Sequence, residues 1–198
     1  MKILAFIDMH GSVTALKKIK KKSQNCDIIV CGGDFTIFEQ NMEKLLKEFS
    51  KLKKEVLMIH GNHEEEELLR HFCHKYKNIH FIHGTHFIYK DVVFLGWGGG
   101  GFSLRDKEFE KKGKKFKKFL HNHKDKAFVL VTHAPPHNTK LDKIGKDHVG
   151  NKSIRNFIKD NKVDLCISGH IHENDGKMDK IGKSTVIHPG REGKILKI

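Results

Sequence analysis

The sequence contains few cysteines, and none are spaced as a disulfide or zinc framework requires. Its four cysteines include no C-x-x-C pair, and three of them lie in or beside apolar runs, which excludes a disulfide-stapled domain and a zinc ribbon. No apolar stretch approaches bilayer length, and no basic segment followed by an apolar one opens the chain, so neither a membrane span nor a secretory signal is predicted. These absences favour a cytoplasmic protein without a membrane partner.

Proline and glycine are also too few for a fibrous or low-complexity chain. The 198 residues include 3 prolines and 18 glycines, and 37% of them are hydrophobic, which excludes collagen-like and disordered chains. The length is that of one typical domain. Because no internal repeat or linker-like stretch divides the chain, we expect residues 1–198 to form a single domain.

Arginine is rare among the basic residues. Lysine and arginine together number 38 against 24 acidic residues, a formal net charge of +14, but only four of the 38 are arginine. A lysine-rich surface attracts polyanions, whereas proteins that read DNA bases rely on the bidentate contacts of arginine. The charge therefore favours a solvated surface, and nucleic acid stays an alternative substrate that the sequence does not require.

Helical patterns separate the first three apolar runs of the chain. The predicted elements alternate as strand 2–7, helix 13–22, strand 27–31, helix 38–53, strand 55–59 and helix 64–75. Such alternation predicts a parallel βαβ sheet, in which ligand sites lie beyond the carboxyl ends of the strands.

The middle of the chain has a different pattern. Short apolar runs at 79–82, 87–89 and 92–95 predict an antiparallel meander, and with it a second sheet. A helix is expected over 105–124, and its lysines indicate a solvated outer face. The last third is expected to hold strand 127–131, helix 152–159, strand 164–168 and short strands at 185–187 and 195–198. The predicted fold class is therefore α/β.

Five short polar clusters follow predicted strands. They are Asp8-Met9-His10-Gly11, Gly32-Gly33-Asp34, Gly61-Asn62-His63-Glu64, Thr132-His133 and Gly169-His170-Ile171-His172. In two of them the candidate ligands stand at i and i+2, which puts both side chains on one side of an extended chain. Imidazole and oxygen ligands without a thiolate suit Mn, Fe, Ni or Zn better than they suit a structural zinc site.

Each cluster alone also has an ordinary structural explanation. Asp8 or Asp34 can cap a helix, Asn62 is a common turn residue, and His133 can be a hydrogen-bonded residue at a strand end. The occurrence of all five clusters in this order favours one shared site.

The ordered set D-x-H, G-D, G-N-H-E, H and G-H-x-H resembles the calcineurin-like metallophosphoesterase superfamily over residues 8–172. The resemblance implies a four-layer α/β/β/α sandwich of two mixed sheets flanked by helices, with a dinuclear metal centre at the strand ends. It implies two divalent ions per chain, manganese first, with iron, nickel, zinc and cobalt as alternatives. The implied ligands are Asp8, His10 and His172 for the first ion, Asn62, His133 and His170 for the second, and Asp34 as the bridge between them.

The same resemblance implies hydrolysis of phosphate esters. A metal-bridging hydroxide would attack phosphorus in line, and His63 would contact the phosphate and protonate the leaving group as general acid. A phosphodiester is the expected substrate. Phosphomonoesterase and nuclease activities are alternatives, as is a non-catalytic scaffold, and the oligomeric state is open.

Two segments depart from the family pattern. Asp34 leads into Phe35–Phe38 in place of a second aspartate, and the late motif is His188-Pro189-Gly190-Arg191 in place of Asn-Pro-Gly-Ser. Neither change removes an implied ligand. Arg191 is expected to join Asn62 and His63 in contacting the substrate, with a salt bridge or a solvated side chain as the alternative. Glu64 is expected to support the site or the first turn of the helix over 64–75.

Overall fold

The computed structural model describes all residues from Met1 to Ile198 and contains two large sheets. The first sheet has the order β13-β1-β2-β3-β4. Its strands are β1 (Lys2–Phe6), β2 (Ile28–Cys31), β3 (Val56–Met58), β4 (Ile79–Phe81) and β13 (Lys194–Lys197). Strands β1 to β4 run parallel, and β13 pairs antiparallel with β1. Every residue of β2 and β3 is buried, as expected for a parallel sheet covered on both faces.

The second sheet has the order β11-β12-β10-β7-β6-β5. Its strands are β5 (His86–Tyr89), β6 (Val92–Trp97), β7 (Ala127–Thr132), β10 (Leu165–Ile167), β11 (Met178–Ile181) and β12 (Ser184–Ile187). The four central strands are parallel and both edge strands are antiparallel. A small hairpin, β8 (Lys143–Ile144) and β9 (Asp147–His148), and a short 3₁₀ helix, His172–Asn174, complete the chain.

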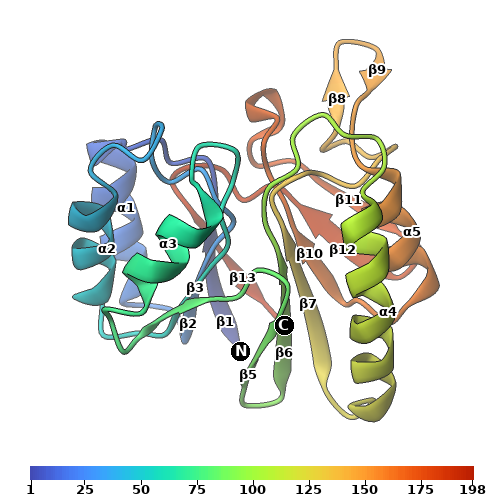
Figure 1. Ribbon diagram of the computed structural model, residues 1–198, viewed down its shortest axis with the longest axis horizontal. Coiled ribbons are helices and arrows are strands. Elements are labelled where there is room, and N and C mark those ends of the chain that lie inside the picture. Colours follow the sequence, from blue (N-terminus) through green and yellow to red (C-terminus); the bar gives the residue numbers. More distant parts are fainter.

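The helices cover the outer faces of the two sheets, which face each other (Figure 1). Helices α1 (Val13–Ser23), α2 (Met42–Ser50) and α3 (Glu66–Cys73) pack on the first sheet, and α4 (Lys107–Asn122) and α5 (Lys152–Asp160) pack on the second. A third apolar cluster fills the space between the sheets, with Val30, Phe94 and Ile167 among its members. These layers confirm the predicted α/β/β/α sandwich of mixed sheets. No helix has the length and hydropathy needed to cross a bilayer.

The predicted meander is wrong in one respect. The strand expected at 79–82 belongs to the first sheet, where β4 runs parallel to β3, and only β5 and β6 form an antiparallel pair. The segment between β4 and β5 therefore crosses from one sheet to the other. Sequence pattern predicts that a strand forms, but its partner is chosen by tertiary packing.

Two of the helices on the first sheet begin later than predicted. The helix expected from residue 38 begins at Met42, because Phe38, Glu39 and Asn41 have positive φ. The helix expected from residue 64 begins at Glu66, and Glu65 caps it by accepting hydrogen bonds from two backbone N–H groups. The segments before both helices remain irregular, and they carry residues of the site described next.

Candidate metal centre

The predicted site residues all follow strands whose carboxyl ends meet at one edge of the sandwich. Asp8 and His10 follow β1, Asp34 follows β2, and Asn62 and His63 follow β3 in the first sheet. In the second sheet, His133 follows β7, while His170 and His172 follow β10. Backbone hydrogen bonds join these loops: the Asp8 N–H donates to the Gly33 carbonyl, and the His10 N–H to that of Asp34. The two sheets thus bring distant sequence segments to one place.

Asp8, His10 and His172 form the first group. Their ligand atoms lie within 4.8 Å of one another, with His10 Nε2 3.0 Å from His172 Nε2 and His172 Nε2 3.9 Å from Asp8 Oδ1. The His10 Nδ1–H donates to the Thr36 carbonyl at 3.1 Å, so in the neutral ring the lone pair of Nε2 faces the group. A backbone carbonyl that orients an imidazole in this way is common behind metal-binding histidines.

Asp34, His133 and His170 form the second group. His133 Nε2 lies 3.4 Å from Asp34 Oδ2 and 3.1 Å from Asn62 Oδ1, while its Nδ1–H donates to the Gly32 carbonyl at 3.0 Å. Asn62 therefore joins this group through its amide oxygen. Asp34 also lies within 4.8 Å of His10 and His63, which places its carboxylate between the two groups.

The charges of the second group favour a cation at its centre. Burial lowers the pKa of His133, but the interaction with Asp34 outweighs it and raises the pKa to about 9. Burial conversely raises the pKa of Asp34, but His133 lowers it to about 2. The oxygens around His133 Nε2 thus stabilise a proton at a position where a metal ion would supply the same charge.

Two buried atoms of candidate ligands have no hydrogen-bond partner within the protein. Asp8 Oδ1 and His170 Nε2 are buried and make no hydrogen bond, although buried polar atoms are nearly always paired. Burial lowers the pKa of His170 to about 4, so its Nε2 can be a neutral nitrogen ligand near neutral pH. Unpaired carboxylate and imidazole atoms, without a thiolate, fit divalent cations such as Mn, Fe, Ni or Zn.

The backbone of this site is strained. Asp8, His10, Asp34 and His170 have φ between 47° and 72°, the left-handed region that costs a non-glycine residue about 1–2 kcal/mol. Close packing adds to the constraint: a Cβ at Gly61 would lie 1.9 Å from Asp34 Oδ1. The glycine of G-N-H-E is therefore required because the Asp34 carboxylate approaches the backbone at that point.

His63 lies beside both groups. The Phe38 N–H donates to His63 Nδ1 at 3.4 Å, so the proton of the neutral ring is on Nε2, which lies 3.9 Å from Asp34 Oδ2. The ring contacts His10 edge-on, with centroids 4.8 Å apart. An imidazole that presents an N–H toward the site can donate a proton there.

Glu64 supports the site and not the first turn of α3. Its carboxylate accepts hydrogen bonds from the backbone N–H groups of Asp34, Thr36 and Gly61 and from the Thr36 hydroxyl, at 2.7–2.9 Å. These bonds join the loops after β2 and β3. Burial raises the pKa of Glu64, and the four donors oppose that effect by stabilising the carboxylate.

His188 contacts the site, although the sequence did not predict a role for it. Its Nε2 lies 3.3 Å from Asp8 Oδ2 and 3.3 Å from Asp175 Oδ1, and the side chain is fully buried. His188 therefore packs against the Asp8 carboxylate, although its Nε2 makes no hydrogen bond. The signal was its place directly after the strand at 185–187, in the segment that differs from the family motif.

Arg191 lies outside the two groups of candidate metal ligands. Its side chain is 58% exposed, and its Nε is 3.9 Å from Asp175 Oδ2, so the structure pairs it with Asp175 and not with a candidate ligand. A role for Arg191 in substrate binding stays a prediction.

Comparison with known sequences gives the family. The family model described as calcineurin-like phosphoesterase matches residues 1–174. The uncharacterized protein MJ1162 of Methanocaldococcus jannaschii is 31% identical over 200 residues, which cover 96% of this chain and 88% of that protein.

Comparison with solved structures gives the same fold. The crystal structure of TT1561 of Thermus thermophilus superposes with a TM-score of 0.77 at 17% identity and covers 96% of this chain and 88% of that one. A dimetal phosphatase from Danio rerio superposes with a TM-score of 0.68 at 12% identity and covers 94% and 86%. The chain therefore belongs to the calcineurin-like phosphoesterase family and is a metal-dependent phosphoric ester hydrolase.

Proposed function

We propose that this chain is a phosphodiesterase that uses two divalent ions. In this proposal Asp8, His10 and His172 hold one ion, Asn62, His133 and His170 hold the second, and Asp34 bridges them. The support is the arrangement of the two groups of side chains around the Asp34 carboxylate. The nitrogen and oxygen donors suit Mn, Fe, Ni and Zn alike, and manganese is the first candidate on the family resemblance.

The bound ions would supply Lewis acidity, neutralising phosphate charge and lowering the pKa of water towards about 7. Asn62 and His63 would contact the phosphate from the loop after β3. His63 would donate its Nε2 proton to the departing oxygen, a contribution of about 10²–10⁴-fold for an alkoxide leaving group. The hydrogen bond from Phe38 to Nδ1 supports this role, because it keeps the proton on the nitrogen nearer Asp34.

Two exposed phenylalanines favour a diester over a monoester. Phe38 is 72% exposed and packs against His63 with ring centroids 4.5 Å apart, and Phe102 is 63% exposed and lies 4.8 Å from the His170 ring. They come from loops of different sheets and border the site beside different candidate residues. A diester carries an organic group on both ester oxygens, and each ring offers one of those groups an apolar contact.

The test is hydrolysis of bis-p-nitrophenyl phosphate and p-nitrophenyl phosphate, measured side by side. The metal-stripped chain would be reconstituted separately with Mn²⁺, Ni²⁺, Zn²⁺ or Mg²⁺. We expect metal-dependent turnover with a higher kcat/KM for the diester. A higher kcat/KM for the monoester would contradict the diesterase proposal and favour a phosphatase, and cleavage of oligonucleotides in preference to both would favour a nuclease.

A further inference from the structure

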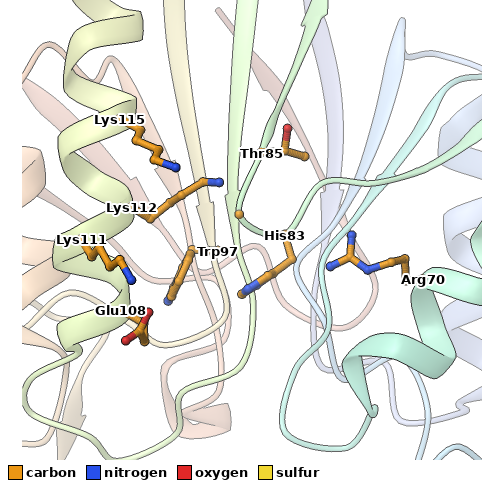
Figure 2. Close-up of a pocket in the computed structure, with 9 residues that line it drawn as sticks. Arg70, His83, Thr85, Trp97, Glu108, Lys111, Lys112 and Lys115 are labelled. Carbon is orange, nitrogen blue, oxygen red and sulfur yellow. The ribbon is translucent and has the colours of Figure 1, made fainter.

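A second concave site lies on the flank of the sandwich, between α3 and α4 (Figure 2). Its volume is about 560 Å³, within the range of small-molecule sites. The side chains that matter for its chemistry are Arg70, His83, Trp97, Lys111, Lys112 and Lys115. None of them belongs to the two groups of candidate metal ligands.

The walls of this pocket, called here the flank pocket, are strongly basic. Lys111, Lys112 and Lys115 stand at i, i+1 and i+4 on α4, a spacing that turns them toward one side of the helix. Figure 2 shows the side chains of Lys112 and Lys115 extending from α4 toward the pocket, with Arg70 on the opposite wall. The only carboxylate in the lining is that of Glu108.

The lysines of the flank pocket are not neutralised by carboxylates. None of the three ammonium groups forms an ion pair, and Lys112 Nζ lies 5.9 Å from the Phe116 ring centre. Arg70, by contrast, pairs with Glu66 and Glu67 and lies over the Phe81 ring. The pocket thus holds three ammonium groups free to bind an anion, beside an arginine whose position is fixed.

The inner end of the flank pocket is aromatic. The rings of Trp97 and His83 lie 4.6 Å apart at an interplanar angle of 32°. The Trp97 Nε1–H donates to Asp106 and the His83 Nδ1 accepts from the Gly98 N–H, so much of the polar capacity of both rings is already used. Because the two rings face each other, the pair offers a ligand only the apolar surface that this contact leaves open.

We infer that the flank pocket binds a polyphosphate anion of nucleotide size, separately from the metal centre. Lysines bind phosphate oxygens as point charges, which suits a flexible chain of phosphates. The aromatic pair can contact a nucleobase attached to that chain. A small ligand is favoured over a nucleic-acid strand because the volume of about 560 Å³ is that of a small-molecule site. This inference does not depend on the proposed phosphodiesterase activity.

Ligand binding in the flank pocket can be followed by tryptophan fluorescence, because Trp97 lines the pocket and is the only tryptophan in the sequence. We would titrate the metal-loaded full-length chain with tripolyphosphate and with ATP, under excess Mg²⁺ so that the polyphosphates do not remove the metal ions. A saturable change in tryptophan fluorescence is expected with both. The fluorescence change should saturate at a lower concentration of ATP than of tripolyphosphate, since only ATP carries a base.

A pair of matched double variants locates the binding. Lys112→Gln with Lys115→Gln removes two charges from the flank pocket and should weaken tripolyphosphate binding about tenfold or more. Lys114→Gln with Lys117→Gln removes the same charge from another side of α4, where both lysines line a different groove, and should leave the affinity within about twofold.

Three outcomes would overturn the inference. One is the absence of a saturable change in the wild-type chain. Another is a result in which the two double variants do not differ. If both weaken tripolyphosphate binding equally, binding reflects overall charge, and if neither weakens it, binding reflects the metal centre. The third is tighter binding of a short oligodeoxynucleotide than of ATP with the same dependence on Lys112 and Lys115, which would make this flank a nucleic-acid surface.

Discussion

The candidate metal centre anchors its carboxylates by burial and by hydrogen bonds from the backbone, whereas the flank pocket presents its cations on one side of a surface helix. In the centre, Asp34 is 2% exposed and its carboxylate has neighbours from both sheets. In the flank pocket, Lys111 and Lys115 are exposed and have no ion-pair partner. Removing one carboxylate should therefore disrupt metal binding at the centre. Removing charges from the flank pocket should lower its affinity for an anion step by step.

Asp34→Ala should have the largest effect. The change removes the carboxylate that lies between the two ligand groups, so we expect metal content to fall from two ions to one or none and kcat/KM to drop by about 10³-fold or more. Metal analysis after dialysis and hydrolysis of bis-p-nitrophenyl phosphate measure both. Thr36→Ser, a buried neighbour on the same loop, is the control. Full metal content in Asp34→Ala would contradict the bridging role.

His63→Ala should leave metal content unchanged and slow the hydrolysis of substrates with poor leaving groups. With a dinucleoside phosphate the expected loss is about 10²–10⁴-fold, because an alkoxide must be protonated as it departs. With bis-p-nitrophenyl phosphate the loss should be much smaller, since p-nitrophenolate leaves without that help. Equal losses on the two substrates would show that His63 does not act as the acid.

The metal-free chain should lose stability as the pH rises from 6.5 to 9. The folded pKa of His133 is raised to about 9 from 6.5, so the stabilisation from its protonated form is complete below the lower value and is lost as the pH passes the upper one. Urea unfolding of chelator-treated chain across this interval measures the change, and His133→Gln should abolish that slope. A stability that rises across the interval in the wild type would contradict the assignment.

Metal affinity should change in the opposite direction over the same interval. A metal ion has to displace the proton from His133 Nε2, so affinity should increase about tenfold per pH unit while that proton is present. A competition titration with a chromophoric chelator measures this slope. An affinity independent of pH would mean that no proton leaves the group on binding.

Phe102→Ala should have the smallest effect. We expect KM for bis-p-nitrophenyl phosphate to rise about threefold to tenfold, from loss of one apolar contact, with kcat nearly unchanged. KM for p-nitrophenyl phosphate should rise less, because a monoester has only one organic group. Leu104→Ala, 48% exposed on the same loop, is the matched control. A larger increase for the monoester would contradict the diester arrangement.

Local spacing indicated which residues would come together at the candidate centre, and it gave no indication of the flank pocket. Asp8, Asp34 and His133 each stand within three residues of the end of a recognisable strand, and the parallel order brings such ends together. The place of His188 after the strand at 185–187 indicated its position but not its contacts, because these join it to Asp8 from the first sheet and to Asp175.

The flank pocket could not be predicted from the residue pattern of α4 alone. The lysines of α4 follow an ordinary amphipathic pattern, and the prediction of a solvated face holds for Lys114 and Lys117, which are exposed. For Lys112, the neighbours that make a pocket come from the crossing between β4 and β5 and from α3. That crossing was the one point where the predicted strand pairing was wrong.

The layer between the two sheets has a consequence for how the molecule opens. Its core is a cluster of apolar residues such as Ala5, Leu57 and Val129, and apolar contacts are less directional than hydrogen bonds. The proposed ligands of each ion come from both sheets, so bound metal would cross-link them at one edge. Removing it should speed amide hydrogen exchange near the carboxyl ends of β2 and β10 while the opposite edge keeps its protection.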